Sequence, residues 1–483
     1  MEDIVSLTPK AGQKVWLIGI KGTGMCALAE IFQSRGIDVS GSDVPDEFYT
    51  DAVLRDLNIP FTRGFDAANL PDNLDFVVRS AAYDRDHTEV AAAYKRGLPV
   101  MLYPEALGLL SQGVSAGAVS GVHGKTTTSA IAGCLVQALN LPGGVLVGSA
   151  VPAFGNRSTL VQGNEFFIAE TCEYRRHFMY FSPDRMILTS VEPDHLDYFK
   201  DMNDISEAFS SFVNKLPQGG TLIYCADDPG ASAVAQGAGE KRKDLLILPY
   251  GFSVKGDWGI RKIPSGIQGE NHFRINSLDK EFSLRIPGDH VIQDCAAALA
   301  LVCDELRVMN RNIDPVVLDQ LEQGIYNFTG SRRRSEIVGE CGDILIMDDY
   351  GHHPSAVRKT LEGIREFYPG RRIIVDFMSH TYSRTAALLD DFSKSFGAAD
   401  QVILHKIYAS AREEYEGTVT GEDLYKKTCT HHNKVQYFTE VMEALPELMK
   451  QLKPGDLFIT MGAGDNWQLG RRLYAALSEE KQL

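Results

Sequence analysis

Residues 120–128, with the sequence Ser-Gly-Val-His-Gly-Lys-Thr-Thr-Thr, constrain the fold most, because a strand-like apolar run precedes them and a helix-like run follows. In a loop of this kind, Gly121 and Gly124 let backbone N–H groups approach phosphate oxygens. Lys125 reaches the outer phosphates, and the Thr126 hydroxyl is placed to bind Mg²⁺. The alternative is a glycine- and threonine-rich turn that only begins an ordinary helix. Although the loop is shorter than a standard Walker A sequence, it predicts binding of a nucleoside triphosphate.

Length and charge limit the remaining possibilities. A chain of 483 residues is too long for one core and suggests about three domains. Its 48 basic and 64 acidic residues give a formal charge of −16, so the surface repels nucleic acid and anionic lipid. We therefore expect small-molecule partners, no nucleic acid, and local basic clusters wherever an anionic substrate binds.

The termini and the cysteines indicate a cytoplasmic protein. The first residues, Met-Glu-Asp-Ile-Val, are acidic and lack the apolar core of a signal peptide. No apolar run approaches the length of a membrane span, so no membrane insertion is expected. Eight scattered cysteines without a Cys-x-x-Cys pair are typical of reduced thiols.

A second glycine loop lies near the N-terminus. A strand-like run at residues 15–20 leads into Gly22 and Gly24, and a helix pattern follows. Asp43 comes about twenty residues after these glycines, where a Rossmann unit places the acid that meets a ribose. The glycine spacing departs from the Rossmann pattern, and such turns also need glycine for steric reasons alone, so both interpretations stay open.

Further strand-like runs organise the chain into α/β units. We expect boundaries near residues 111 and 329, which gives domains at 1–110, 111–328 and 329–483. The apolar runs between helix patterns are typical of buried parallel strands. These runs are residues 76–80 and 98–102, then 166–169, 185–189 and 220–225, and finally 343–347, 372–376, 401–404 and 457–460, with an alanine-rich helix at 294–306.

Acidic residues follow two central strands. Glu170 ends one run, with Glu173 one turn further, and His195 lies in the segment Glu-Pro-Asp-His-Leu-Asp at residues 192–197. The carboxyl ends of parallel strands are where ligands bind in an open α/β sheet. Glu170 is thus a candidate to complete the Mg²⁺ site begun by Thr126, and His195 a candidate for a second metal or a phosphate. The alternative is that these residues only cap helices.

The third domain contributes two polar segments. They are Asp-Asp-Tyr-Gly-His-His-Pro at residues 348–354 and Ser-His-Thr-Tyr-Ser-Arg-Thr at residues 379–385. Histidine, tyrosine and arginine side chains there can bind a carboxylate and orient an amine without acting as nucleophiles. A metal site at His352 and His353 is the less favoured interpretation, because adjacent residues of an extended stretch point opposite ways, so we expect one of them to pack internally.

The chain resembles the Mur ligases, ATP-dependent amide-forming enzymes of peptidoglycan precursor synthesis, and the resemblance covers nearly its whole length. The two segments of the third domain are similar to those of the family member that adds the first amino acid, L-alanine, to UDP-N-acetylmuramate. The motifs, in the order of the family, lie at residues 19–25, 121–128, 169–174, 192–197, 330–336, 348–354, 380–385 and 462–465.

The resemblance implies an α/β fold with a Rossmann-like N-terminal domain for the UDP-sugar, a central P-loop ATPase domain with a mostly parallel sheet, and a Rossmann-like C-terminal ligase domain. It implies ATP and Mg²⁺ as cofactors, and an acyl phosphate that the amine of L-alanine attacks. Lys125, Glu170, His195, His380 and Arg384 would then be catalytic. Three sets of residues would bind the ligands. The residues that contact ATP would be Gly121, His123, Gly124, Lys125, Thr126, Thr127, His290, Asp294 and Arg333, and those that bind metal ions would be Thr126, Glu170 and His195. The residues that contact the UDP-sugar and the amino acid would be Gly22, Thr23, Gly24, Met25, Ser42, Asp43, Ser80, Tyr350, His352, His380 and Arg384.

Two departures from the family pattern leave parts of the site open. Residues 288–294 lack both asparagines expected near adenine, with Val291 and Asp294 in their places, and Thr381 replaces the usual arginine of a His-Arg-Tyr segment. A carbamylated lysine cannot be assigned. Three other functions also fit parts of the sequence: ligation of a preformed tripeptide to UDP-N-acetylmuramate during wall recycling, a nucleotide-gated sensor of UDP-muramyl sugars, and a nicotinamide-dependent oxidoreductase.

Overall fold

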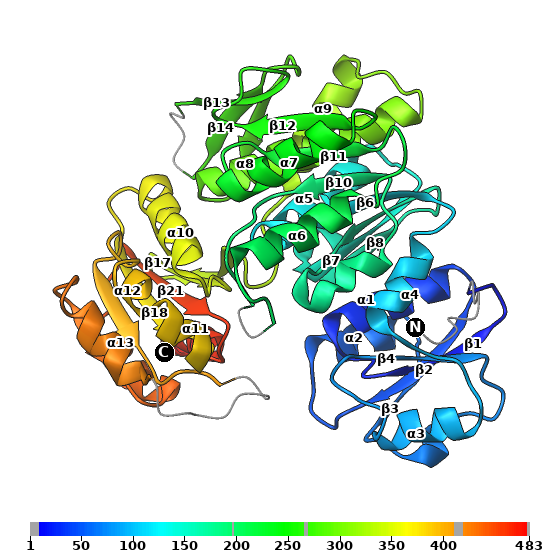
Figure 1. Ribbon diagram of the computed structural model, residues 1–483. Helices are drawn as coiled ribbons and strands as arrows, with labels where there is room; N and C mark the ends of the chain where they lie inside the picture. The colour runs from blue at the N-terminus through cyan, green and yellow to red at the C-terminus, as the bar shows by residue number, and fades with distance from the viewer. Residues whose placement is uncertain (1–8, 196–197, 265–268, 410–418, 481–483) are drawn as a thin grey trace. The chain divides into compact units, whose positions relative to one another are not determined.

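The computed structural model describes residues 9–195, 198–264, 269–409 and 419–480. These residues form three β-sheets with helices between their strands (Figure 1). Contacts divide the chain into two compact units. The first unit comprises residues 1–260, 275–280 and 294–328, and the second comprises 261–274, 281–293 and 329–483, apart from the undescribed residues. Within the described ranges, no helix is both long and apolar enough to cross a membrane.

The N-terminal sheet of the first unit is parallel throughout, in the order β3-β2-β1-β4-β5. Successive side chains of β1 enter two different cores: Val15 and Leu17 pack with α1, whereas Trp16 and Ile18 pack with Val90 of α3. Helices therefore cover both faces, as expected for a sheet whose strands are continuous apolar runs. The elements are β1 Lys14–Ile18, α1 Thr23–Ser34, β2 Asp38–Asp43, α2 Tyr49–Asp56, β3 Phe61–Arg63, β4 Phe76–Arg79, α3 Thr88–Lys95, β5 Val100–Leu102 and α4 Tyr103–Leu110.

Within the first unit, the strands of the central sheet follow the order β13-β12-β11-β10-β6-β9-β7-β8. All its neighbours are parallel except β7 and β8, which form an antiparallel edge. The elements are β6 Ser115–Ser120, α5 Lys125–Ala138, β7 Gly143–Val151, β8 Arg157–Val161, β9 Phe166–Glu170, β10 Arg185–Leu188, α6 Met202–Val213, β11 Thr221–Cys225, α7 Pro229–Lys241, β12 Leu246–Gly251, β13 Trp258–Ile263, α8 Asp289–Val308 and α9 Pro315–Asn327. The predicted alanine-rich helix, α8, thus begins earlier than residue 294.

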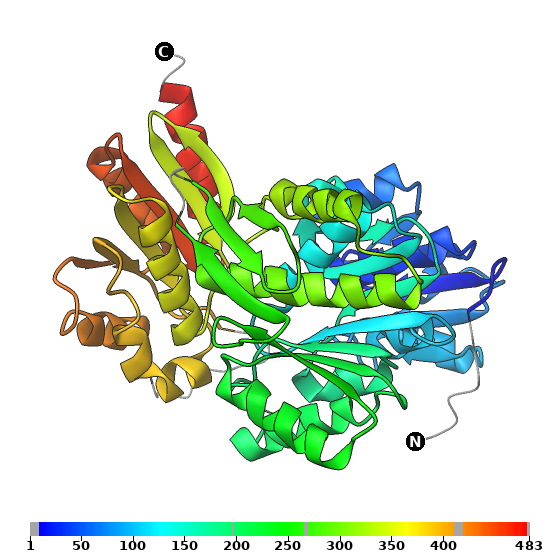
Figure 2. The same cartoon turned by 90° about the horizontal axis from the view of Figure 1, so that it is seen from above.

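The second unit contains an antiparallel hairpin of β14 (Asn271–Ile275) and β15 (Glu281–Leu284) and a larger sheet in the order β16-β17-β21-β18-β19-β20. Only β16 is antiparallel in the larger sheet. Helix α15 packs along β16 and β17 (Figure 2). The remaining elements are β16 Glu336–Cys341, β17 Ile344–Asp349, α10 Pro354–Phe367, β18 Arg372–Met378, α11 Tyr382–Ala387, α12 Leu389–Ser393, β19 Gln401–Leu404, α13 Gly421–Thr428, β20 Val435–Tyr437, α14 Leu445–Gln451, β21 Asp456–Gly462 and α15 Trp467–Glu480.

Each of the three tryptophans of the chain lies in a different sheet or in a helix that packs against it. Trp16 lies in β1 with 3% of its surface exposed, and its indole N–H donates to Glu89 over 3.1 Å. Trp258 begins β13 of the central sheet. Trp467 begins α15, where the guanidinium groups of Arg332 and Arg471 lie over its ring.

Candidate active site

The predicted phosphate loop joins β6 to α5 at the carboxyl end of the central sheet. Gly121 and Gly124 have φ angles of 136° and 81°, which side chains rarely tolerate. A Cβ atom on Gly121 would lie 2.0 Å from the Thr189 hydroxyl oxygen, so this position also has no room for a side chain. Two backbone N–H groups of the loop are already bonded, since Val122 donates to the Ser190 carbonyl over 3.0 Å and His123 to the Ser190 hydroxyl over 2.9 Å. The glycines therefore keep side chains away from the N-terminus of α5, as an anion site requires.

Lys125 begins α5 and is held by an acidic partner. Its ammonium group donates to the Gly121 carbonyl over 2.6 Å and to a Glu173 oxygen over 2.9 Å. The Glu173 side chain is only 3% exposed. Burial opposes both charges, yet the mutual attraction prevails: the pKa of Lys125 is raised and that of Glu173 is lowered. Both groups are thus charged at neutral pH.

Thr126 and Glu170 meet as the sequence predicts. The Thr126 hydroxyl donates to one Glu170 oxygen over 3.1 Å, and the backbone N–H of Gly148 donates to the other over 2.7 Å. Glu170 is the last residue of β9, and Gly148 lies on the neighbouring strand β7. The two strands therefore fix the direction of this carboxylate towards the phosphate loop.

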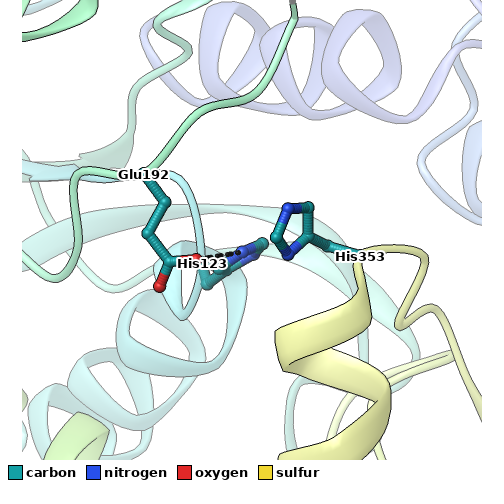
Figure 3. Close-up of side chains that lie close together, drawn as sticks. All are labelled: His123, Glu192 and His353. Atoms are coloured by element: carbon teal, nitrogen blue, oxygen red, sulfur yellow. Dashed lines mark ion pairs between the residues drawn. The ribbon is translucent and has the colours of Figure 1, made fainter. Parts of the chain in front are cut away.

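Histidines surround the loop on two sides. The His195 ring lies 3.5 Å from a Glu173 oxygen and packs on the Tyr174 ring, with centroids 4.8 Å apart. His123 lies 3.8 Å from Glu192, the ion pair drawn as a dashed line in Figure 3. Lys125, Thr126, Glu170 and His195 are thus brought together, and their contacts with ATP and metal ions stay predictions. The rest of the motif, residues 196–197, lies outside the described residues.

Asp294 of α8 reaches the same loop from the other side. One of its oxygens accepts a hydrogen bond from the Thr128 hydroxyl over 3.0 Å, and a Cβ atom on Gly124 would lie 2.6 Å from that oxygen. Because α8 already begins at Asp289, Asp294 does not cap this helix. Contact of Asp294 and Thr127 with ATP stays a prediction.

The N-terminal glycine loop forms hydrogen bonds with residues that the sequence analysis assigned to the same site. The Asp43 carboxylate accepts the backbone N–H groups of Lys21 and Val44, each over 2.7 Å. Gly22 precedes α1, and the Thr23 hydroxyl accepts a hydrogen bond from Tyr49 over 3.1 Å. Of the remaining predicted residues here, Gly24 faces the Tyr103 ring, Met25 is buried, Ser42 donates to Glu89, and Ser80 accepts the N–H of Ala82.

Lys21 is a residue of this loop that sequence reasoning missed. Its side chain is fully buried, and its ammonium group donates to the carbonyls of Val44 and Asp46 and lies 3.8 Å from Asp51. Lys21 therefore ties the glycine loop to the segment after β2. Its neighbours in the sequence carry the glycine pattern but give no indication that the lysine would point inward.

In the second unit, Arg333 and Tyr350 lie together. The Arg333 guanidinium donates to Asp348 over 3.0 Å and to the carbonyls of Gly462 and Gly464 over 2.7 and 3.2 Å. It also lies over the Tyr350 ring, 5.1 Å from its centroid. Arg333 thus fixes the Gly-Ala-Gly-Asp segment after β21, and a contact with ATP stays a prediction.

The histidines of the second unit have distinct roles. His353 caps α10 by accepting the N–H of Ser355, which confirms that one of the adjacent histidines packs internally. The His352 ring bonds the Tyr350 carbonyl over 2.9 Å. Arg384 donates to the His380 carbonyl over 2.7 Å, so these two predicted residues are held together at the start of α11.

His290, also in the second unit, lies at the start of α8 against Gly288, which has a φ angle of 104°. Burial lowers its pKa to about 4, so the imidazole is neutral at physiological pH. It is therefore a hydrogen-bonding group rather than a cation there.

Comparison with known proteins agrees with this geometry. The family described as "Mur ligase family, catalytic domain" matches residues 14–114, "Mur ligase middle domain" matches 119–302, and "Mur ligase, glutamate ligase domain" matches 333–464. A Treponema pallidum protein named UDP-N-acetylmuramate–L-alanine ligase is 48% identical over 97% of this chain and 98% of its own length. A Desulfitobacterium hafniense protein of the same name is 39% identical over 95% of this chain and 99% of its own length.

Solved structures show the same architecture. That of the Thermotoga maritima UDP-N-acetylmuramate–alanine ligase has a TM-score of 0.75 and 24% identity, and covers 97% of this chain and 99% of its own. A murein peptide ligase from Psychrobacter arcticus has a TM-score of 0.63 and 22% identity, with 96% and 99% coverage. These likenesses confirm the predicted three-part α/β fold, and, with the sequence identities, they lead to one conclusion: the chain belongs to the Mur ligase family.

Proposed function

We propose that this protein ligates L-alanine to the lactoyl carboxylate of UDP-N-acetylmuramate with ATP, releasing ADP and phosphate in peptidoglycan precursor synthesis in the cytoplasm. The observation that supports this most directly is the phosphate loop, in which Lys125 and Thr126 lie beside the acidic side chains of Glu173 and Glu170. The names of relatives up to 48% identical supply the substrates.

The chemistry is two successive displacements. A carboxylate oxygen of the sugar attacks the γ-phosphorus, and the bond to ADP breaks, which leaves an acyl phosphate. The neutral amine of L-alanine then attacks the acyl carbon, and the tetrahedral intermediate loses phosphate and a proton to give the amide. Such steps depend on positioning and charge neutralisation, and Lys125 supplies a cation at the transferred group.

Mg²⁺ fits the oxygen atoms beside the loop. Thr126 Oγ1 and the Glu170 carboxylate oxygen are 3.1 Å apart. Adjacent ligands of an octahedral site with metal–oxygen distances of about 2.1 Å lie about 3 Å apart, so both oxygens can serve one ion. A bound ion there would add positive charge next to the phosphates. His195 is the proposed contact of a second ion or of a phosphate.

The remaining residues are assigned by position. The glycine loop of the N-terminal sheet, with Ser42, Asp43 and Ser80, is proposed to bind the UDP-sugar. Tyr350, His352, His380 and Arg384 are proposed to line the lactoyl and amino-acid site, because their side chains follow strand ends of the C-terminal sheet. Arg384 offers a planar fork that can grip a carboxylate in two places.

The test is to incubate the protein with ATP, Mg²⁺ and UDP-N-acetylmuramate, and to add L-alanine, the tripeptide or buffer. We expect phosphate release that requires L-alanine, and a product heavier than the sugar by one alanyl residue. Release with the tripeptide alone would support the recycling ligase instead, and binding of both nucleotides without any release would support a sensor. The fold does not separate these functions, since the murein peptide ligase shares it.

A further inference from the structure

A buried carboxylate and a buried histidine, neither of which has a role assigned above, face each other in the C-terminal sheet. Asp376 lies in β18 and is 0% exposed, and His405, the residue after β19, is 1% exposed. The imidazole Nε2 is 2.7 Å from a carboxylate oxygen of Asp376. Charged groups are seldom buried this completely unless they are paired.

The hydrogen bonds show that this pair shares a proton. His405 Nδ1 is 3.0 Å from the Phe438 carbonyl, which can only accept, so Nδ1 carries a hydrogen. A neutral imidazole would then turn the Nε2 lone pair towards the carboxylate at 2.7 Å, an arrangement of two acceptors. One more proton must therefore lie between Nε2 and Asp376. The pair is either imidazolium with carboxylate or neutral imidazole with carboxylic acid.

Asn466 completes the cluster. Its side-chain N–H groups donate to Asp376 Oδ1 over 2.8 Å, to the Asp376 carbonyl over 3.1 Å and to the Met461 carbonyl over 3.0 Å. Asn466 is 0% exposed and directly follows the Gly-Ala-Gly-Asp segment at residues 462–465. The cluster thus joins the ends of β18, β19 and β21.

The joined strands lead into the proposed amino-acid site or into segments next to it. The segment after β18 holds His380 and Arg384. The segment after β19 holds Tyr408, whose backbone N–H donates to the Ser379 carbonyl over 2.9 Å and whose ring lies 6.0 Å from the His380 ring. The segment after β21 is the one that Arg333 grips through the carbonyls of Gly462 and Gly464.

We propose that Asp376, His405 and Asn466 form a positioning cluster that, while it holds its shared proton, aligns His380 and Arg384 for binding of the acceptor amino acid. This inference rests on the proposed ligase function. The three residues are positioning residues, because the hydrogen bonds described for them go to the backbone and to one another.

A dependence on pH follows from the charges around His405. Burial alone would lower its pKa, but the facing Asp376 carboxylate, the Phe438 carbonyl and the charge of Asp465 together raise it above 6.5. Lys406 next to it is paired outward with Glu440. A histidine with a raised pKa stabilises the folded arrangement below its unfolded pKa, and this stabilisation is lost as pH rises through the folded pKa. Alignment should therefore weaken at alkaline pH.

Two substitutions distinguish an effect of the shared proton from an effect of side-chain packing. In Asp376→Asn, the amide can donate to a neutral Nε2 and still accept from Asn466, so every hydrogen bond persists without an ionisable pair. In His405→Gln, a buried carboxylate loses its cation. The double variant restores a neutral amide pair. The matched control is His432→Gln, since His432 also bonds a backbone carbonyl, that of Ala399, and is paired with no carboxylate among the described residues.

The measurement is kcat and KM for L-alanine and for ATP between pH 6.5 and 9.5. Each constant is divided by the value for Asp376→Asn at the same pH, because the titration of the alanine amine affects both proteins equally and cancels in this ratio. We expect the wild-type KM ratio for L-alanine to rise severalfold with pH. His405→Gln should raise this KM at least tenfold with little change for ATP, and Asp376→Asn should rescue it in the double variant.

Flat ratios with pH, equal losses for ATP and L-alanine, or no rescue in the double variant would overturn the proposal. The failure of the proposed function is distinguishable, because it would appear as absent L-alanine-dependent turnover in the wild type. In that case the same series is run with the amine that supports phosphate release. Thermal unfolding of each variant at pH 7 identifies a variant that lost its fold, and the Asp376→Asn protein then still tests the pH ratio against wild type.

Discussion

A buried ion pair between Lys125 and Glu173 is the most consequential single contact at the residue scale. The motif at residues 120–128 predicts that the lysine reaches the phosphates, because its spacing from the glycines is fixed by phosphate geometry. Its acidic partner follows a strand by three residues, and that offset alone does not tell whether a glutamate points into the loop or into solvent. For the same reason the inward direction of Lys21 was not predictable. Direction depends on tertiary packing, which the local pattern does not contain.

Lys125→Ala should lower L-alanine-dependent phosphate release about a thousandfold, because it removes the cation beside the transferred phosphoryl group. The change also leaves Glu173 buried without its main partner, so the double variant with Glu173→Gln is measured in parallel to separate catalysis from stability. Lys241→Ala, an exposed lysine of the first unit, is the control. More than a tenth of wild-type turnover in the double variant would remove Lys125 from the chemistry.

Glu170→Gln should raise the Mg²⁺ concentration needed for half-maximal rate, because an amide replaces a hard anionic oxygen with nearly the same shape. The amide oxygen can retain only one of the two hydrogen bonds, from Thr126 or Gly148. The measurement is a Mg²⁺ titration of phosphate release, with Glu165→Gln, an exposed residue before β9, as the control. Superimposed titrations of wild type and variant would make Glu170 a structural residue.

At the scale of elements, the strands predicted from sequence are buried parallel ones, whereas the antiparallel strands and the parallel strand β7 were not predicted. Residues 185–188 and 401–404 are buried on both faces, are apolar after their first residue, and match the predicted runs almost residue for residue. The antiparallel strands β8, β14 and β16 contain polar residues among the apolar ones, and β14 and β16 also have exposed positions, so none of them is a continuous apolar run. Helix α8 was predicted too short, because its first turn holds polar residues that alone resemble a loop.

His290, at the start of α8, should make the fold sensitive to acid. Its folded pKa of about 4 lies below the unfolded value of 6.5, so the unfolded chain binds more protons between these limits. The stability that the neutral imidazole contributes is present above pH 6.5 and is lost as pH falls towards 4. As pH falls over this range, the free energy of unfolding of His290→Gln should therefore decrease by about 2 kcal/mol less than that of the wild type.

Chemical denaturation at several pH values measures this difference. His431→Gln, which changes an exposed histidine of the same unit, should follow the wild type. Parallel stability curves for wild type and His290→Gln would show that His290 does not titrate in this window.

At the scale of the whole molecule, the three domains predicted from sequence are packed as two compact units. The N-terminal and central sheets share the first unit, and Glu30 of α1 connects them: it pairs with Arg157 over 2.8 Å and accepts a hydrogen bond from Thr159 of β8. A glutamate in an apolar helix gives no sign in the sequence of a partner more than a hundred residues away. The boundaries at 111 and 329 stay predictions.

Glu30→Ala should weaken the attachment of the N-terminal sheet to the central one, because it leaves Arg157 and Thr159 without their shared acceptor. A cost of about 2 kcal/mol is expected for breaking a largely buried charged pair. Limited proteolysis between residues 110 and 115 should become faster. The control is Asp38→Ala, which breaks the exposed pair with Lys14. Equal cleavage rates for the two variants would show that Glu30 does not join the sheets.

The positions of the three tryptophans have an optical consequence. Trp16 and Trp258 lie in strands of two different sheets, and Trp467 begins the helix that packs against the third, so replacing any two by phenylalanine leaves a chain whose fluorescence comes from one region only. The three single-tryptophan chains would have different emission, since Trp16 is enclosed and bonded to Glu89 while Trp467 lies under two guanidinium groups. Sugar, nucleotide and amino acid could then be added one at a time, and the emission would show which sheet responds to each.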